Sequence, residues 1–403
     1  NMPIDWYSEL TWIRDYRFPL YPKKGQSAID CLSEWINDYN SSLQSNITFL
    51  GTEETQRIIN AGNNLVEAMN LYLQNDFAGA FTLFNDTMNA VKTCLPTVRV
   101  GKKRNCLAEA YPYYRICAGN NHFTYKDCLH IPYQKRNLAS TGRFSSPGMP
   151  CSYMASCKEI AWFECGMPNE FQLAEYLANE RTEKQLLCLD INPLTDTISL
   201  INLGRNNLTE EKLRYLAKNA AEMCYVLPLI AACSVVAKDK YKQFVDAYII
   251  PQMLMAWIKT CTDYVGVRYR SDVDNILVRN NGGYNVAMPA IEPDEDGYST
   301  VLMNLFGISK DGQNNNLSEK YKKPEVKTID TSKKFTEKFK TQLNELTIFC
   351  ADIQYQQEHT KSGDLCEILA NMHSVCYTFQ VLLDDYIINI ENKKYAIVVT
   401  LSK

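Results

Sequence analysis

Residues 142–164 constrain the fold of this chain more than any other segment. Their sequence, GRFSSPGMPCSYMASCKEIAWFE, joins a Gly/Pro-rich loop, a short strand and a helix that carries a carboxylate. Gly142 and Gly148 can adopt backbone conformations that are closed to other residues, and two prolines stiffen the loop. Arg143 and the serines beside it are suited to binding an anion. We therefore expect the loop to approach a phosphate closely.

The remainder of this segment predicts a strand followed by a helix. Residues 152–155 have the apolar and aromatic character of a strand, and a helix can start at Ser156 or Cys157. Glu164 ends the apolar run of that helix. A carboxylate beside Trp162 either points to water or faces into a pocket, and this segment alone leaves both alternatives open.

Three ordered segments together resemble the RES-domain family, which is related in fold to ADP-ribosyltransferases and diphtheria-toxin-type enzymes. The first is YPYYRIC, which places Arg115 on an aromatic-rich strand. The second is the loop, strand and helix described above, which places Tyr153 and Glu164. The third is GVRYRSDVDN, which contains Ser271 and precedes NNGGYNVAMP. The resemblance covers residues 106–308, about half of the chain.

The resemblance implies a fold, a substrate and a role for each matched residue. The implied fold is α+β, with an ADP-ribosyltransferase-like core of short strands, helical insertions and helical flanking segments. The implied substrate is NAD, with no metal. Glu164 would hold a ribose hydroxyl and oppose the positive charge that develops on the ribose, while Arg115 would clamp the pyrophosphate. Tyr153 would offer its ring or its hydroxyl, and Ser271 would bind the ribose or the nicotinamide end.

Further residues complete the predicted NAD site. The family often has a tyrosine after the first arginine, but Ile116 stands there, so the flanking aromatic is expected from Tyr114 or its neighbour Tyr113. Arg143 and Arg268 are the additional phosphate candidates. Taken singly, each matched residue also fits a structural role, such as an ion-pair partner, a core aromatic or a turn residue. Because the matched residues occur along the chain in the order of the family's motifs, we favour an NAD site over these separate structural roles.

The acceptor of the cleaved ADP-ribose stays open at this stage. Water would make the protein a glycohydrolase, inorganic phosphate a phosphorylase, and a protein side chain an ADP-ribosyltransferase. The resemblance implies a toxin or defence effector that depletes NAD, and any antitoxin would be a separate protein. The competing class is a noncatalytic nucleotide-sensing or interaction module.

Composition sets the broader expectations. The 403 residues have a formal net charge of −4 with dispersed lysines and arginines, so nucleic acid is not an expected partner. We found neither a basic-then-apolar N-terminal signal nor an apolar run of the roughly 20 residues that span a bilayer, so we expect a cytoplasmic protein with no membrane contact. The 15 cysteines are odd in number and lack a CxxC pair, which argues against a disulfide framework or a zinc module.

The chain is expected to divide into four segments. Periodicity predicts a helical region over residues 1–105 and a helical extension with a β-hairpin over 332–403, a change in composition predicts a linker or flexible loop over 309–331, and the resemblance implies a RES-like domain over 106–308. That extension could extend the core, regulate access to the site or mediate self-association into a homo-oligomer. Predicted helices cover residues 28–39, 53–73, 76–91, 209–227 and 240–259 (bent near Pro251), and predicted strands cover 184–191, 265–269 and 284–288.

Overall fold

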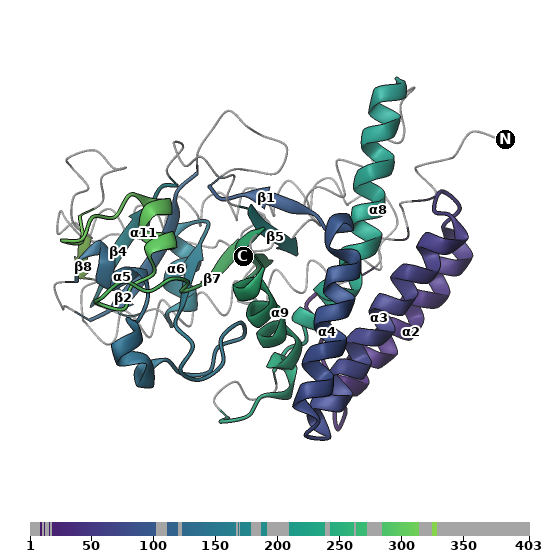
Figure 1. Ribbon diagram of the computed structural model, residues 1–403, viewed down its shortest axis with the longest axis horizontal. Coiled ribbons are helices and arrows are strands. Elements are labelled where there is room, and N and C mark those ends of the chain that lie inside the picture. Colours follow the sequence, from purple (N-terminus) through teal and green to yellow (C-terminus); the bar gives the residue numbers. More distant parts are fainter. Residues whose placement is uncertain are drawn as a thin grey trace, which may run out of the picture.

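The protein is an α+β structure in which a mixed sheet lies beside a group of long helices (Figure 1). The computed structural model describes residues 9, 12, 16, 18–101, 111–119, 123–166, 168, 170–178, 187–191, 209–237, 242–261, 263–271, 284–313 and 325–328. The predicted α+β class is confirmed. The C-terminal extension 332–403 and the glycine pair 282–283 lie outside the described residues.

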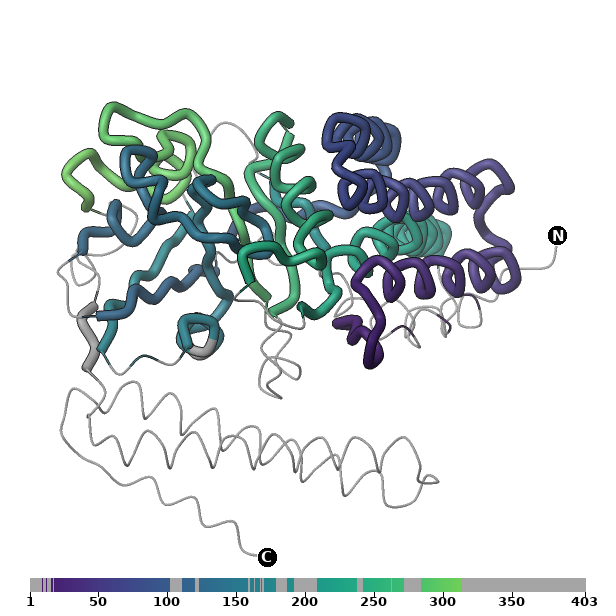
Figure 2. The backbone as a smooth tube through the Cα atoms, turned by 90° about the horizontal axis from the view of Figure 1, so that it is seen from below, coloured from purple at the N-terminus to yellow at the C-terminus, as the bar shows by residue number. Residues whose placement is uncertain are grey.

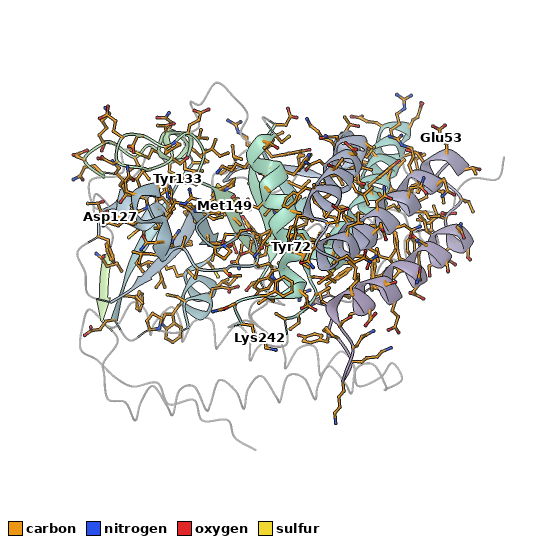
Figure 3. The ribbon with its side chains drawn as sticks, turned by 60° about the horizontal axis from the view of Figure 1, so that its bottom comes forward. Glu53, Tyr72, Asp127, Tyr133, Met149 and Lys242 are labelled. Carbon is orange, nitrogen blue, oxygen red and sulfur yellow. The ribbon has the colours of Figure 1, made fainter. Side chains whose placement is uncertain are left out.

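The N-terminal helices form one end of the molecule, as predicted. Helix α2 begins with a capping box, in which Ser27 and Asp30 bond each other's backbone N–H groups. Its buried Leu32, Ile36, Tyr39 and Leu43 recur at helical spacing and face the core. Figure 3 shows α3 running from Glu53 at this end to Tyr72 near the middle of the molecule. The three helices are α2 (Ala28–Asn46), α3 (Thr52–Leu73) and α4 (Phe77–Val91).

The sheet has eight described strands in the order β1-β5-β6-β7-β3-β2-β4-β8. Only the described pair β5–β6 is parallel, and the other pairs are antiparallel. Strands β2 and β3 pair at a single position, Tyr114 with Ala155, so the sheet is weakly joined there. The strands are β1 (Thr97–Arg99), β2 (Tyr113–Ala118), β3 (Cys151–Ala155), β4 (Glu170–Tyr176), β5 (Leu187–Ile191), β6 (Tyr264–Arg270), β7 (Tyr284–Pro289) and β8 (Glu325–Thr328).

Helices α8 (Glu210–Cys233) and α9 (Ile249–Thr260) join the helical end to one face of the sheet. Their apolar residues share one continuous core with α2, α3 and α4 and with Val267 and Ala287 of the sheet. Figure 2 shows α9 between the sheet and the helical end. The sheet and the helical end are therefore packed through a common hydrophobic core.

A second core covers the other face of the sheet. It brings together strand residues such as Tyr113 and Met288 with the short helices α5 (Tyr125–Leu129) and α11 (Thr300–Phe306). The sheet is therefore buried on both faces, and its residues alternate between two different environments.

Some predicted boundaries are wrong for local reasons. The helix predicted over 240–259 begins at Ile249, after the turn η4 (Asp246–Tyr248), and Pro251 lies in its first turn, where a missing N–H costs no intrahelical bond. Helix α8 continues beyond the predicted residue 227, through Pro228, to Cys233. Strand β1 lies within the region predicted as helical, and β8 lies within the predicted linker 309–331, where it pairs with β4.

The composition of helix α8 differs from the expectation that the chain contains no apolar segment long enough to span a membrane. By length and composition alone it is apolar enough to do so, but 78% of its most apolar stretch is buried inside the protein. That burial accounts for its composition. The described cysteines are free thiols.

His130 is a buried neutral group that makes the fold sensitive to acid. Its Nδ1 donates to the carbonyl of Ile131 at 2.8 Å, and its Nε2 accepts from the backbone N–H of Ser299 at 2.9 Å. Burial lowers the pKa of His130 from 6.5 to about 4. Since Nε2 already accepts a hydrogen bond, a proton there would break the contact.

We predict that stability falls as the pH drops from about 6.5 towards 4. In that range the unfolded chain binds a proton at His130 that the folded protein does not, so the free energy of unfolding rises with pH. The full contribution is about 3 kcal/mol at most. Urea unfolding of the wild type and of His130→Gln at several pH values measures it. The variant should show a shallower slope across this range, and an equal slope would contradict the assignment.

Candidate functional site

A pocket of about 420 Å³ opens beside the single-pair junction between β2 and β3. Its wall comes from both of these strands, from β6 and β7, from the loop before β3 and from the end of helix α6 (Lys158–Glu164). Strands β2 and β3 pair at only one position, and residues of both strands beyond that pair line the pocket. The lining residues are Tyr114, Arg115, Ile116, Gly142, Arg143, Tyr153, Met154, Ala155, Ala161, Glu164, Cys165, Tyr248, Tyr269 and Asn285.

Glu164 lies in this pocket and is held by two donors. Ser271 Oγ and Asn285 Nδ2 both donate to the same carboxylate oxygen, Oε1, the latter at 2.7 Å. The side chain itself is exposed, whereas Ser271 and Asn285 are buried. Glu164 therefore lines the pocket while remaining exposed to solvent.

The elements that position these three residues meet at one place. Ser156, just after β3, donates its backbone N–H to the carbonyl of Tyr284 at the start of β7, and its Oγ accepts from the backbone N–H of Tyr284. Helix α6 therefore begins beside β7 and ends at Glu164, one short helix later. Ser271 directly follows β6, the other neighbour of β7.

The loop before β3 is closed on itself and fixed to its surroundings. Gly142 and Ser145 exchange backbone hydrogen bonds of 2.8 and 3.3 Å. A Cβ at position 142 would lie 2.7 Å from both Ser145 Oγ and the Tyr153 hydroxyl, so a side chain does not fit. Gly148 has a φ of 75°, which favours glycine. Gln252 of α9 donates to the carbonyls of Gly142 and Ser145 and accepts from Ser146 Oγ.

Tyr153 contributes its ring to the pocket and its hydroxyl to the loop. The hydroxyl donates to Ser145 Oγ at 2.8 Å and accepts from the backbone N–H of Phe144 at 3.1 Å. Burial raises the pKa of Tyr153, so it stays protonated at neutral pH. Of the two roles predicted for Tyr153, the structure favours the ring as its contribution to a ligand.

Arg143 leaves this loop and lines the pocket. Its guanidinium donates to the carbonyl of Cys233 at the end of α8, at 3.2 Å, and lies 5.9 Å from the ring centre of Tyr248. Tyr269 lies between opposite charges. Burial raises its pKa strongly, Glu164 acts in the same direction and Arg143 in the opposite one. The ring of Tyr269 therefore lies near both a cationic side chain, Arg143, and an anionic one, Glu164.

Tyr114 and Arg115 enter the pocket from β2. The Tyr114 ring lies under the ammonium of Lys158, 5.7 Å from its centre. Arg115 donates through Nη1 to the carbonyl of Leu129, the last residue of α5, at 2.6 Å. That bond fixes the guanidinium through one of its five N–H donors. The predicted site residues Tyr114, Arg115, Arg143, Tyr153 and Glu164 thus share one pocket, with Ser271 bonded to it.

Arg268 does not belong to this group, and its prediction as a phosphate ligand is wrong. Its side chain is buried on the opposite face of β6, where Nε and Nη2 donate to the two oxygens of Asp190 at 2.9 and 2.5 Å. Burial acts to lower the pKa of Arg268, but Asp190 outweighs it and raises the pKa. Tyr269, the next residue of β6, lines the pocket, whereas Arg268 is held by Asp190 and does not line it.

Sequence reasoning missed several pocket residues, among them Asn285, Tyr248 and Tyr269. Asn285 was noticed only as part of the final strand motif, although an amide at a buried strand position is itself a signal. Tyr248 and Tyr269 come from segments far from the recognised loop and carry no local motif. Their positions follow from the packing of α9 and the register of β6 with β7.

The pocket combines cationic, aromatic and acidic side chains. Two arginines, several tyrosines and one carboxylate line it. Among the residues that the structure describes, no group of three or more His, Cys, Asp or Glu side chains could hold a metal.

Comparison with known proteins gives one similarity. The chain is 29% identical over 205 residues to a Bacillus subtilis (strain 168) protein named "Putative toxin YopC". The match covers 49% of this chain and 45% of that protein, so the chain spans less than half of its relative's length. No protein-family model matches the chain, and no solved structure matches it.

The Arg268–Asp190 pair is predicted to act on stability. Asp190→Ala leaves a buried, unpaired guanidinium, so we expect the free energy of unfolding to fall by about 3–5 kcal/mol. Replacing both partners, as in Asp190→Leu with Arg268→Met, should recover most of that loss because no buried charge is then left. Chemical denaturation measures both variants. A double variant no more stable than Asp190→Ala would contradict the pairing argument.

Proposed function

We propose that this chain is a RES-type enzyme that cleaves the bond between nicotinamide and ribose in NAD. The observation that carries the proposal is Glu164, an exposed carboxylate fixed through Oε1 by Ser271 and Asn285, in a pocket that also holds Arg115 and Arg143. The pocket contains both arginines and a carboxylate. This combination fits NAD, whose pyrophosphate is anionic and whose ribose becomes positively charged during cleavage.

Cleavage of this bond passes through an oxocarbenium-like state, in which positive charge develops on the ribose while nicotinamide leaves as a neutral ring. Glu164 would stabilise that charge and hold a ribose hydroxyl. Its position at the end of a helix fixed to β7 reduces the reorganisation needed when the charge appears. The protein would supply no nucleophile, because the acceptor attacks the ribose directly.

The arginines would bind the pyrophosphate. Arg143 extends from a loop whose backbone is fixed by Tyr153 and Gln252, and its guanidinium offers paired donors for phosphate oxygens. Arg115 is anchored to α5 and would contribute a second positive charge. The rings of Tyr153 and Tyr269 would pack against the nicotinamide or the ribose.

The biological role that we infer is that of a toxin acting by NAD depletion. The similarity to a protein named as a toxin supports this inference. The proposed cleavage of NAD in the pocket would be the toxic activity. We expect the enzyme to act in the cytoplasm, where NAD is available, and to be restrained by a separate inhibitor protein. Water, inorganic phosphate and a protein side chain remain the candidate acceptors.

Glu164→Gln is predicted to lower nicotinamide release from NAD by about 100-fold or more, because it removes the charge that opposes the oxocarbenium. Purified protein is incubated with NAD, with and without phosphate, and the products are followed by mass spectrometry. ADP-ribose would identify water as the acceptor, and its 1-phosphate would identify phosphate.

The matched control is Glu170→Gln, a glutamate at the start of β4 outside the pocket lining, which should keep wild-type activity. Unchanged turnover in Glu164→Gln would exclude the catalytic assignment. NAD binding without any turnover by the wild type would favour the nucleotide-sensing module instead.

Arg143→Met is predicted to raise the KM for NAD by about 10-fold or more, with a smaller effect on kcat, because it removes a phosphate contact present before and during the reaction. Arg214→Met is the control, since Arg214 is exposed on α8 and paired with Glu210. Steady-state kinetics of both variants test the assignment. An unchanged KM in Arg143→Met would remove Arg143 from the binding site.

A further inference from the structure

Asn285 is buried at a strand position where its amide is only half satisfied. The residue is 4% exposed, and its Nδ2 donates to Glu164 Oε1 at 2.7 Å. Its Oδ1 is buried as well, and no described residue donates a hydrogen bond to it. A buried acceptor without a partner costs stability, so an apolar side chain of similar size would suit the fold alone at least as well.

The carboxylate oxygen that accepts from Asn285 also accepts from a second donor. Ser271 Oγ also donates to Oε1, and within the described part of the chain no donor reaches Oε2. Both donors are buried, while the carboxylate itself is exposed to the pocket. The two bonds therefore hold Oε1 and leave Oε2 available to a ligand.

The backbone of Asn285 is held more firmly than that of Glu164. Strand β7 pairs Asn285 with Tyr269 of β6 on one side and with Ala155 of β3 on the other. Glu164, by contrast, is the last residue of a helix of only seven residues. A strand paired on both sides is a firm support, whereas the end of a short helix frays. The side-chain amide of Asn285 therefore connects the end of α6 to β7 and holds it in place.

We propose that Asn285 is a positioning residue that acts through Glu164, and that it occupies a buried strand position for its N–H donor and not for the stability of the fold. This inference rests on the proposed NAD cleavage. An asparagine suits the role because its Nδ2 only donates, so it never competes with Glu164 for a proton.

The test replaces Asn285 with leucine, which removes the donor and the unsatisfied oxygen together. We expect kcat to fall by about 10- to 100-fold, as for loss of a hydrogen bond to a charged group, and the KM for NAD to change by less than about 3-fold. The thermal midpoint of Asn285→Leu should equal or exceed that of the wild type. Loss of activity without loss of stability is a result that a purely structural role would not give.

A second measurement uses the shared oxygen. Because Ser271 and Asn285 hold the same Oε1, the combined variant Ser271→Ala with Asn285→Leu should lose less activity than the product of the two single losses. Independent, multiplicative losses would overturn the inference. Asn219→Leu is the control, since Asn219 is a buried asparagine of α8 that bonds the Tyr215 carbonyl away from the pocket, and its kcat should be unchanged.

The outcomes separate this inference from the proposed function. Full activity in Asn285→Leu would overturn only the positioning role, provided that Glu164→Gln is inactive. A wild-type protein without NAD turnover would overturn the proposed function, and the thermal comparison would still decide whether Asn285 serves the fold. A marked drop in the thermal midpoint of Asn285→Leu would show that it does, and would also overturn the inference.

Discussion

The carboxylate of Glu164, bonded through one oxygen to Ser271 and Asn285, is the interaction on which the rest of the site depends. It joins the end of α6 to β6 and β7, two strands that are far from α6 in the sequence. Without it, the helix would end in an exposed carboxylate with no fixed direction. With it, one oxygen is held by the protein and the other stays available. A charge that is fixed before a ligand arrives stabilises a transition state better than one that must reorganise.

The weak junction between β2 and β3 gives this carboxylate a pocket to face. A fully paired sheet would bury both strands against each other, whereas here Tyr114 and Ala155 form the single pair. The loop before β3 fills one side of the opening and is fixed by Tyr153 and Gln252. The ring of Phe144 in that loop lies 4.5 Å from the ring of Tyr269, which pairs in register with Asn285. The arginine side and the carboxylate side of the pocket are therefore connected through Phe144 and Tyr269.

Local sequence predicted the elements whose signals are local. The capped, periodic α2 and the loop, strand and helix around Glu164 follow from short-range patterns, and so they appear where expected. Long-range pairing could not be predicted in the same way. The sequence predicts a linker where β8 lies, because the pairing of β8 with β4 depends on a strand about 150 residues earlier. Tyr248 and Asn285 were missed as site residues because only packing brings them to the pocket.

The case of Arg268 shows what separates a structural arginine from a ligand-binding one. In sequence, Arg143 and Arg268 are alike, each beside an aromatic residue and near a matched motif. In the structure, Arg268 meets a carboxylate that satisfies it through two bonds in a buried setting, so a phosphate would have to displace Asp190 at high cost. Arg143 lines the pocket, where it donates to a backbone carbonyl and lies beside the ring of Tyr248. The buried carboxylate of Asp190, and not the residue type, is what removes Arg268 from the pocket.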